Sequence, residues 1–163
     1  SSGFATYFAT GKNCWSLSSA TPWALRGARL STRLSLASKY LVLMPTNTQV
    51  RLSQKITDDA ERSRLFKVLR PLSENSGMGV IARTQGEGVP ASLREEDLRQ
   101  LCELWRHLQQ SLQGAKAPTE VFKELPIQTR LVRDLAGPNT LSIYVNEADI
   151  YQRLRNYLSL HAP

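Results

Sequence analysis

The sequence predicts an α+β fold in which a small mixed sheet packs against several helices, with an extended N-terminal arm. Short apolar runs bounded by proline, glycine or small polar residues alternate with longer segments whose apolar residues recur at helical spacing. The longest apolar run, residues 40–44, stops at Pro45 and is much shorter than the roughly 18 residues that cross a bilayer. With 163 residues, of which 41% are hydrophobic, the chain is long enough to bury a core. No membrane partner is expected.

The first 23 residues form the predicted arm, and we divide the rest into domains at 24–117 and 118–163. The arm has a single charged residue, Lys12, but several aromatic residues: Phe4, Tyr7, Phe8, Trp15 and Trp23. Aromatic anchors are typical of protein interfaces, so this segment is interpreted as an arm that docks on a protein partner. The alternative is a targeting segment, which is also rich in serine and poor in acids.

Three strand patterns follow the arm. Residues 28–35 alternate basic or polar with apolar side chains, although the alternation slips at Thr32. Residues 40–44 read as a buried strand that ends at Pro45. Turn residues at 46–48 then lead into a strand at 50–53. The sequence therefore predicts that residues 40–53 form a hairpin.

Helical spacing dominates the centre of the chain. Asp58 and Asp59 indicate a helix start, because acids favour the positive end of the helix dipole. Pro71 is expected to end this helix, leaving residues 73–77 as a polar loop before a short strand at 78–84. After a loop at 85–90, Ser92 and Glu95 predict a capping box for a long helix that ends at Gly114.

The last third repeats the same kinds of element. A break is expected near Leu125, with a helix restarting at Pro126 and running to about residue 135. Residues 141–145 predict a strand, and Asn146 is expected to cap a final helix.

Positive charge is concentrated in the first third of the chain. Residues 1–57 contain no acid, and the net charge of +7 is accounted for there by Lys12, Arg26, Arg29, Arg33, Lys39, Arg51 and Lys55. A basic, acid-free stretch favours an anionic partner, either a nucleic acid or a membrane surface. We take Arg26, Arg29, Arg33, Lys39, Arg51 and Lys55 as candidates for binding an RNA backbone.

No catalytic or metal-binding arrangement is predicted. Cys14 and Cys102 lie far apart with no further ligand at metal-binding spacing, and the two histidines, His107 and His161, form no recognisable triad. Two G-x-G-x-x-A matches, at 77–82 and 86–91, lack the strand-to-helix context and charge of a dinucleotide site. The acids near residue 58 are explained by the helix start. No cofactor is expected.

Arg83 and Thr84 are the strongest candidate site. They end the predicted strand at 78–84 and precede a glycine-containing loop. A guanidinium offers a planar fork of donors that matches phosphate, and a threonine hydroxyl adds another donor. The pair is thus a candidate phosphate pocket, while a solvated arginine at a strand end is the simpler alternative.

Several segments resemble consecutive landmarks of the ribonuclease E/G family. They are Gly27-Ala28-Arg29-Leu30-Ser31-Thr32, Ser38-Lys39-Tyr40-Leu41-Val42-Leu43-Met44-Pro45, Ser53-Gln54-Lys55-Ile56, Gly79-Val80-Ile81-Ala82-Arg83-Thr84 and Arg130-Leu131-Val132-Arg133-Asp134. The resemblance covers residues 26–160. It implies a 5′-sensor region followed by part of a ribonuclease-H-like subdomain, and it implies that Arg83, Thr84 and Val42 bind the 5′-monophosphate of RNA, with Arg26 as a weaker candidate.

The sequence also departs from that family. Most of the S1-like RNA-binding domain and the catalytic domain are expected to be absent, because the family's metal-binding aspartates and its paired-cysteine zinc motif have no counterpart here. Without those carboxylates, metal-assisted cleavage has nothing to hold its ion. The resemblance therefore implies no enzyme activity for this chain.

These observations predict a non-catalytic RNA- or ribonucleoprotein-binding protein, part of a larger assembly such as an organellar ribosome. A mitochondrial location is preferred over a plastid one, with the cytoplasm otherwise. The alternative function is the 5′-monophosphate-sensing part of a split endoribonuclease whose catalytic domain is on another chain. A third class is a structural interaction protein that no longer contacts RNA.

Overall fold

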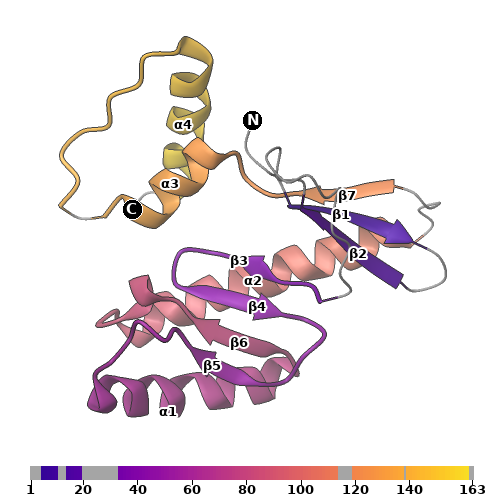
Figure 1. Ribbon diagram of the computed structural model, residues 1–163, viewed down its shortest axis with the longest axis vertical. Helices are drawn as coiled ribbons and strands as arrows, with labels where there is room; N and C mark the ends of the chain where they lie inside the picture. Colours follow the sequence, from indigo (N-terminus) through magenta and orange to yellow (C-terminus); the bar gives the residue numbers. More distant parts are fainter. Residues whose placement is uncertain (1–4, 11–13, 20–32, 114–118, 138, 162–163) are drawn as a thin grey trace, which may run out of the picture.

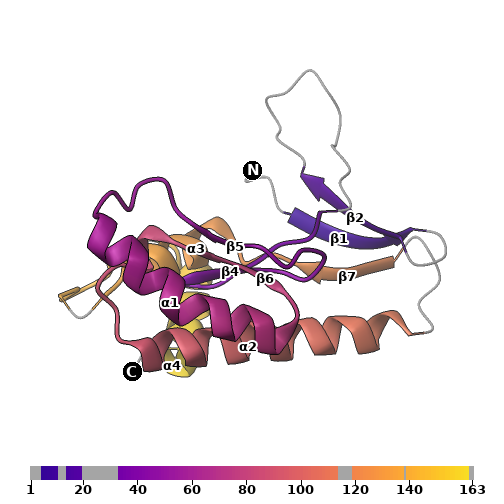
Figure 2. The same ribbon diagram turned by 90° about the horizontal axis from the view of Figure 1, so that it is seen from below.

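A computed structural model describes residues 5–10, 14–19, 33–113, 119–137 and 139–161. These residues form two sheets and the helices around them (Figures 1 and 2). The predicted α+β class with a mixed sheet is confirmed. No helix in the described part of the chain is long and apolar enough to span a membrane.

The main sheet has the strand order β3-β4-β6-β5, with bounds Leu36–Ala37, Leu41–Met44, Gly79–Ala82 and Val50–Leu52. β4 is antiparallel to both of its neighbours, whereas β5 runs parallel to β6. The predicted hairpin at 40–53 is therefore wrong, because β6 lies between the two strands. The local pattern identified both strands. It did not predict their pairing, because β6, the parallel partner of β5, follows only after the crossover through a helix, and no local pattern encodes that pairing.

Two helices cover one face of this sheet. α1 (Asp59–Ser76) packs on β5 and β6, and α2 (Ala91–Leu112) packs on β3 and β4 (Figure 2). Strand residues on that face are buried, while Val42 and Ile81 on the opposite face are only partly covered. The core between sheet and helices comprises Leu34, Leu36, Leu41, Leu43, Leu52, Ile56, Leu65, Leu69, Val80, Ala82, Leu98, Leu101 and Leu108.

The start of α1 follows the prediction, but its end does not. The Asp58 side chain accepts hydrogen bonds from the backbone N–H groups of Ala60 and Glu61, which makes it the N-cap. The helix continues through Pro71 to Ser76, so residues 73–76 are helical rather than a loop. Proline removes one helical hydrogen bond without forbidding its own helical φ, and burial of the flanking turns outweighs that loss. Gly77 ends the helix at φ 66°, a conformation that glycine adopts without strain.

α2 begins one residue before the predicted cap. Pro90 occupies the N-cap position and no side chain caps the helix, so Ser92 and Glu95 form no capping box. Proline suits this position because helix-start N–H groups lack intrahelical partners. Further along, Asp97 is buried and accepts hydrogen bonds from the Ser38 hydroxyl and the Leu41 N–H, which fixes α2 to the start of β4. Burial raises the pKa of Asp97, and these hydrogen bonds oppose the rise.

A second sheet has the order β2-β1-β7, with bounds Cys14–Ser19, Ala5–Thr10 and Thr119–Lys123. Both strand pairings are antiparallel. Much of the segment predicted as an extended arm is thus strand that pairs within the chain, next to the C-terminal half of α2 (Figure 1).

The C-terminal part consists of α3 (Ile127–Leu135) and α4 (Ala148–His161), which pack on each other (Figure 1). The helix predicted from Pro126 is confirmed, with Pro126 as N-cap. The strand predicted at 141–145 is wrong: this segment is irregular, and Leu141 is 98% exposed. Alternating apolar residues form a strand only where another strand supplies hydrogen bonds, and none borders this segment in the described part of the chain.

Candidate functional site

Arg83 lies immediately after β6 and continues its extended backbone. Its N–H donates to the Tyr40 carbonyl at 2.8 Å, which prolongs the β4–β6 pairing by one residue. Side chains alternate along a strand, so Arg83 lies on the same face as Ile81, opposite the helices. Thr84 begins the short 3-10 helix η1 (Thr84–Gly86). The end of β6 therefore places Arg83 on the open side of the sheet.

The Arg83 guanidinium is held by an ion pair that periodicity did not predict. Its two terminal nitrogens donate to the Asp134 carboxylate of α3 at 2.8 and 2.7 Å, and Nη1 also donates to the Ser38 carbonyl. Only 21% of the Arg83 side chain and 23% of the Asp134 side chain are exposed, so water screens this pair weakly. The contact fastens α3 to the end of the main sheet.

Asp134 has a second cationic partner. Arg133 donates from Nε to the same carboxylate at 2.8 Å and from Nη1 to the Ala37 carbonyl at 3.0 Å. Burial alone would raise the pKa of Asp134, but the hydrogen bonds from Arg83 and Arg133 outweigh it and lower the pKa. Two guanidinium groups share one carboxylate, so the cluster keeps one net positive charge.

One edge of the Arg83 guanidinium remains available. The group carries five N–H donors, and the contacts above use both hydrogens of Nη1 and one of Nη2. Within the described residues, Nε donates no hydrogen bond. An oxyanion that meets Nε and Nη2 side by side would find the bidentate geometry that arginine offers to phosphate.

Thr84 reaches the other neighbour of β6. Its hydroxyl lies 3.1 Å from the Ser53 hydroxyl, just beyond β5, whereas Arg83 contacts groups near β4 and α3. The predicted pair is thus brought to one strand end, but no hydrogen bond joins the two side chains in the described part of the protein. Ser53 and Asp134 were missed as site residues, although both lie in segments that carry the family resemblance.

Val42 takes part in the open face of the main sheet. It pairs with Ile81 of β6, and Arg51 of β5 pairs with Ile81 from the other side. These three side chains form a row across the sheet on the face that bears Arg83. The sheet therefore presents a partly apolar surface with a cation at each of two positions, Arg51 and Arg83.

The remaining basic candidates are spread over the surface. Lys39 donates from Nζ to the Ala136 carbonyl at 2.7 Å, next to the end of α3, and its charge lies 5.7 Å from the centre of the Tyr40 ring. Arg33 and Lys55 are exposed. Arg26 and Arg29 lie outside the described residues.

The acids near the start of α1 have structural partners. Asp58 caps the helix, and Glu61 pairs with Arg64 at 2.6 Å while accepting the Gly88 N–H at 3.0 Å. The hydrogen bonds from Arg64 lower the pKa of Glu61 to about 2. Among the described residues, no group of three or more histidine, cysteine, aspartate or glutamate side chains is arranged to hold a metal ion.

Comparison with known proteins decides the family. The sequence pattern of the ribonuclease E/G family matches residues 35–163. The chain belongs to the ribonuclease E/G family. It is 34% identical to ribonuclease E of Nostoc sp. over 137 residues, which are 84% of this chain and 20% of that protein. It is also 32% identical to ribonuclease G of Escherichia coli K12 over 142 residues, 87% of this chain and 29% of that protein.

Ribonuclease E of Haemophilus influenzae is a further relative, 32% identical over 139 residues, 85% of this chain and 15% of that protein. The chain thus spans less than a third of the length of each of these ribonuclease E/G proteins. The matched range contains the whole main sheet from β3 onward, together with Arg83, Asp134 and α4. The resemblance that the sequence segments indicated is confirmed at the level of the family.

Proposed function

We propose that this chain binds RNA and recognises its 5′-monophosphate at Arg83 and Thr84, without cleaving the RNA itself. The observation that carries the proposal is the donor edge of Arg83, which is held in place by Asp134 and Ser38 while Nε stays available. The names of the related proteins, ribonucleases E and G, support RNA as the ligand class.

The cluster around Arg83 suits an anion in two ways. Asp134 fixes the guanidinium, so little side-chain freedom is lost when a ligand binds. Arg133 balances the charge of Asp134, which leaves the field at Arg83 positive. Thr84 supplies a hydroxyl that can turn from Ser53 toward a phosphate oxygen. In this proposal Arg83 and Thr84 bind the phosphate, and Asp134 is a positioning residue.

Participation in a larger assembly is the second part of the proposal. Several apolar side chains of the C-terminal part are open to solvent, with exposures of 76% for Leu135, 98% for Leu141, 93% for Tyr144 and 79% for Leu160. Surfaces of this kind mark contacts with other chains or domains. An organellar ribonucleoprotein such as the ribosome, reached also through residues 1–23, is the assembly that we propose, with a mitochondrial location.

The alternative proposal is a split endoribonuclease in which another chain carries the catalytic domain. It is favoured by the names of the same relatives, which are ribonucleases. Both proposals give Arg83 the same role. They differ in the protein partners that co-purify with the chain: ribosomal proteins in the first case and a catalytic ribonuclease chain in the second.

The binding test compares two RNAs that differ only at the 5′ end. A 3′-labelled ten-nucleotide RNA with a 5′-monophosphate should bind about tenfold more tightly than the 5′-hydroxyl form, since one charge-assisted arginine contact contributes about 1.5–3 kcal/mol. Thr84→Val should reduce this preference while keeping the Arg83–Asp134 pair. Arg83→Lys should abolish it, because lysine keeps the charge but not the fork.

A matched control and a common salt concentration make the comparison specific. Arg106→Gln removes an exposed arginine from α2 and should leave the ratio between the two RNAs unchanged. All measurements are made at moderate salt, because backbone electrostatics would otherwise mask the difference between the ends. Equal affinity of the wild-type protein for both RNAs would refute 5′-end recognition.

A further inference from the structure

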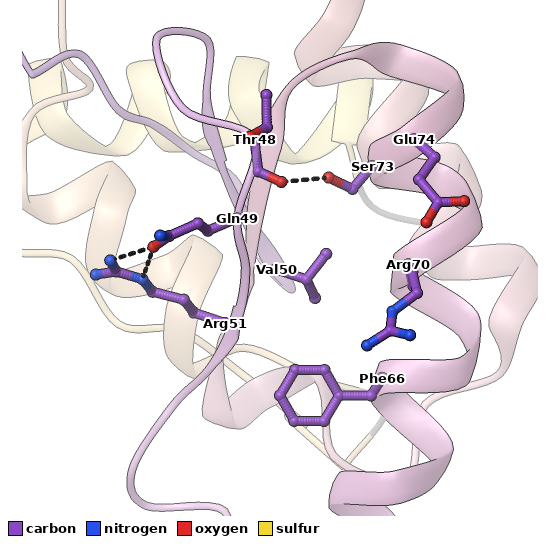
Figure 3. A pocket seen from close by; sticks show the side chains of 8 residues that line it. All are labelled: Thr48, Gln49, Val50, Arg51, Phe66, Arg70, Ser73 and Glu74. Carbon is purple, nitrogen blue, oxygen red and sulfur yellow. Dashed lines mark hydrogen bonds between the residues drawn. The ribbon is translucent and has the colours of Figure 1, made fainter.

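A groove lies on the surface where α1 meets the β5 edge of the main sheet. It has a volume of about 450 Å³ and is lined mainly by Val50, Arg51, Phe66, Arg70, Ser73 and Glu74 (Figure 3). Phe66, Arg70 and Glu74 are four residues apart, so they share one face of α1. The Ser73 hydroxyl donates to the Met78 carbonyl at 2.7 Å and lies 3.4 Å from the Thr48 carbonyl, so it connects that helix to the chain around the groove.

The groove combines an aromatic ring with a cation. Figure 3 shows the Phe66 ring and the Arg70 guanidinium extending from α1 toward Val50 of β5. Phe66 is partly buried and packs with its inner side on the core, which holds the ring in place. Arg70 is exposed and makes no hydrogen bond or ion pair in the described part of the chain. Its donors are therefore available to a ligand.

The surroundings of the groove carry more positive than negative charge. The Arg51 side chain points away from α1, and its Nε donates to the Gln49 side-chain oxygen at 3.1 Å, so its charge lies outside the groove (Figure 3). The groove continues over α1 into a second hollow that adds Lys67 to Phe66 and Arg70. Glu74 is the one acid among the residues that line these two hollows. Two cations, Arg70 and Lys67, against one carboxylate favour an anionic ligand.

We propose that this groove binds an internal nucleotide of single-stranded RNA, with the base stacked on Phe66 and the adjoining phosphates near Arg70 and Lys67. An aromatic face beside cations that track a backbone is the arrangement by which proteins hold single strands. A neutral or acidic peptide has no base to stack on Phe66, so it would gain only general attraction to the cations. The inference goes beyond 5′-end recognition, because it concerns another site and an RNA without a 5′-phosphate.

The position of the groove suits a strand that also reaches the end of β6. Arg51 and Ser53 are two residues apart along one chain, which corresponds to about 7 Å, and Ser53 contacts Thr84. An extended RNA chain that follows β5 would pass from the groove to Thr84 within a few nucleotides. The two sites are thus close enough to share one RNA molecule, although neither needs the other to bind.

The test uses RNA that cannot engage a 5′-phosphate site. The probe is a ten-nucleotide oligouridylate with a 5′-hydroxyl and a 3′-fluorophore, measured by anisotropy against the full chain at several salt concentrations. Phe66→Leu keeps apolar packing but removes the stacking face, so binding should weaken about fivefold or more. Arg70→Gln should weaken binding and lower the slope of log K against log salt by about 0.7, the value for one phosphate contact on a single strand.

Matched variants separate stacking from general attraction. Phe66→Tyr should bind like the wild type, because it restores an aromatic face. Arg106→Gln removes the same charge from an exposed position of α2 and should change the affinity less than Arg70→Gln. A polyphosphate chain of similar length carries charge without bases, so its affinity should be equal for the wild type and Phe66→Leu.

Two results would overturn the inference. If Phe66→Leu and Arg70→Gln both bind the oligonucleotide as tightly as Arg106→Gln does, RNA does not occupy the groove and a protein partner becomes the better occupant. If Arg70→Gln alone weakens binding, the contact is electrostatic and no base stacks there. Neither result bears on 5′-end recognition, which is measured by the ratio of the affinities for 5′-monophosphate RNA and 5′-hydroxyl RNA.

Discussion

The ion pair between Arg83 and Asp134 should contribute measurably to the stability of the fold. It joins residues that are 51 positions apart and connects the end of the main sheet to α3. A double-mutant cycle with Arg83→Gln, Asp134→Asn and the double variant isolates the coupling between them. Two short charge-assisted hydrogen bonds with about a fifth of each side chain exposed should give a coupling of about 1–2 kcal/mol, above the 0.2–1 kcal/mol of exposed pairs.

The Asp134→Asn variant should lose more than the coupling alone. It leaves the guanidinium groups of Arg83 and Arg133 next to each other without their shared carboxylate, so a total cost of about 2–3 kcal/mol is expected. The assay is urea denaturation of the full chain, followed by circular dichroism at pH 7. A coupling below about 0.5 kcal/mol would show that the pair is not energetically significant.

The same pair gives a pH dependence with a definite sign. The pKa of Asp134 is lowered in the folded protein, so the unfolded chain binds its proton more readily. The stabilisation is therefore complete above the unfolded pKa of about 4 and is lost as the pH falls through the lower, folded pKa. The difference in stability between wild type and Asp134→Asn should narrow below pH 4. A difference that stays constant down to pH 2 would contradict this assignment.

Two further outcomes are expected. Gly79→Ala should destabilise the fold by about 1–3 kcal/mol, because a Cβ there would lie 2.9 Å from the Gln49 carbonyl and 3.0 Å from the Asn47 carbonyl. Urea denaturation measures this loss of stability. The comparison variant is Gly88→Ala, whose Cβ would meet no atom within 4 Å but whose φ is 68°, so it shows the cost of backbone strain without crowding. Purified protein with Mg²⁺ should leave single-stranded RNA intact on a denaturing gel, and cleavage that disappears when Asp58 or Glu61 is substituted would reverse the proposal of a non-catalytic chain.

Much of the fold followed from local patterns. The strand at 41–44 and the starts of α1 and α3 lie where apolar spacing, Asp58 and Pro126 indicated them. The errors at the 40–53 hairpin, at Pro71 and at residues 141–145 share one cause, because each depended on a distant partner. Pro71 is tolerated where the surrounding helix turns are buried on the sheet, and residues 141–145 find no strand to pair with among the described residues.

At the candidate site, too, the sequence predicted local features but not distant partners. Arg83 and Thr84 were predicted from donor chemistry, and the structure places both at the end of β6. The partner of Arg83 was not foreseen, since no periodicity relates Arg83 to Asp134. The groove beside Phe66 was also missed, because that phenylalanine fits the apolar stripe of α1 and its partly open ring is visible only once β5 lies alongside.

The position of β6 between β4 and β5 has a consequence for how the chain folds. The ribosome makes β4 and β5 before the strand that lies between them, so nothing joins β4 to β5 until residue 82 has been synthesised. The turn that follows Pro45 leaves β4 and β5 free to pair directly in the meantime. That non-native pairing would have to break before β6 inserts between them. Long-range pairing of this kind slows folding. A truncated chain that stops before Gly79 would therefore contain β3, β4, β5 and α1 but would have no strand to join β5 to β4. Such a chain would be a substrate for chaperones or proteases rather than a smaller binding domain.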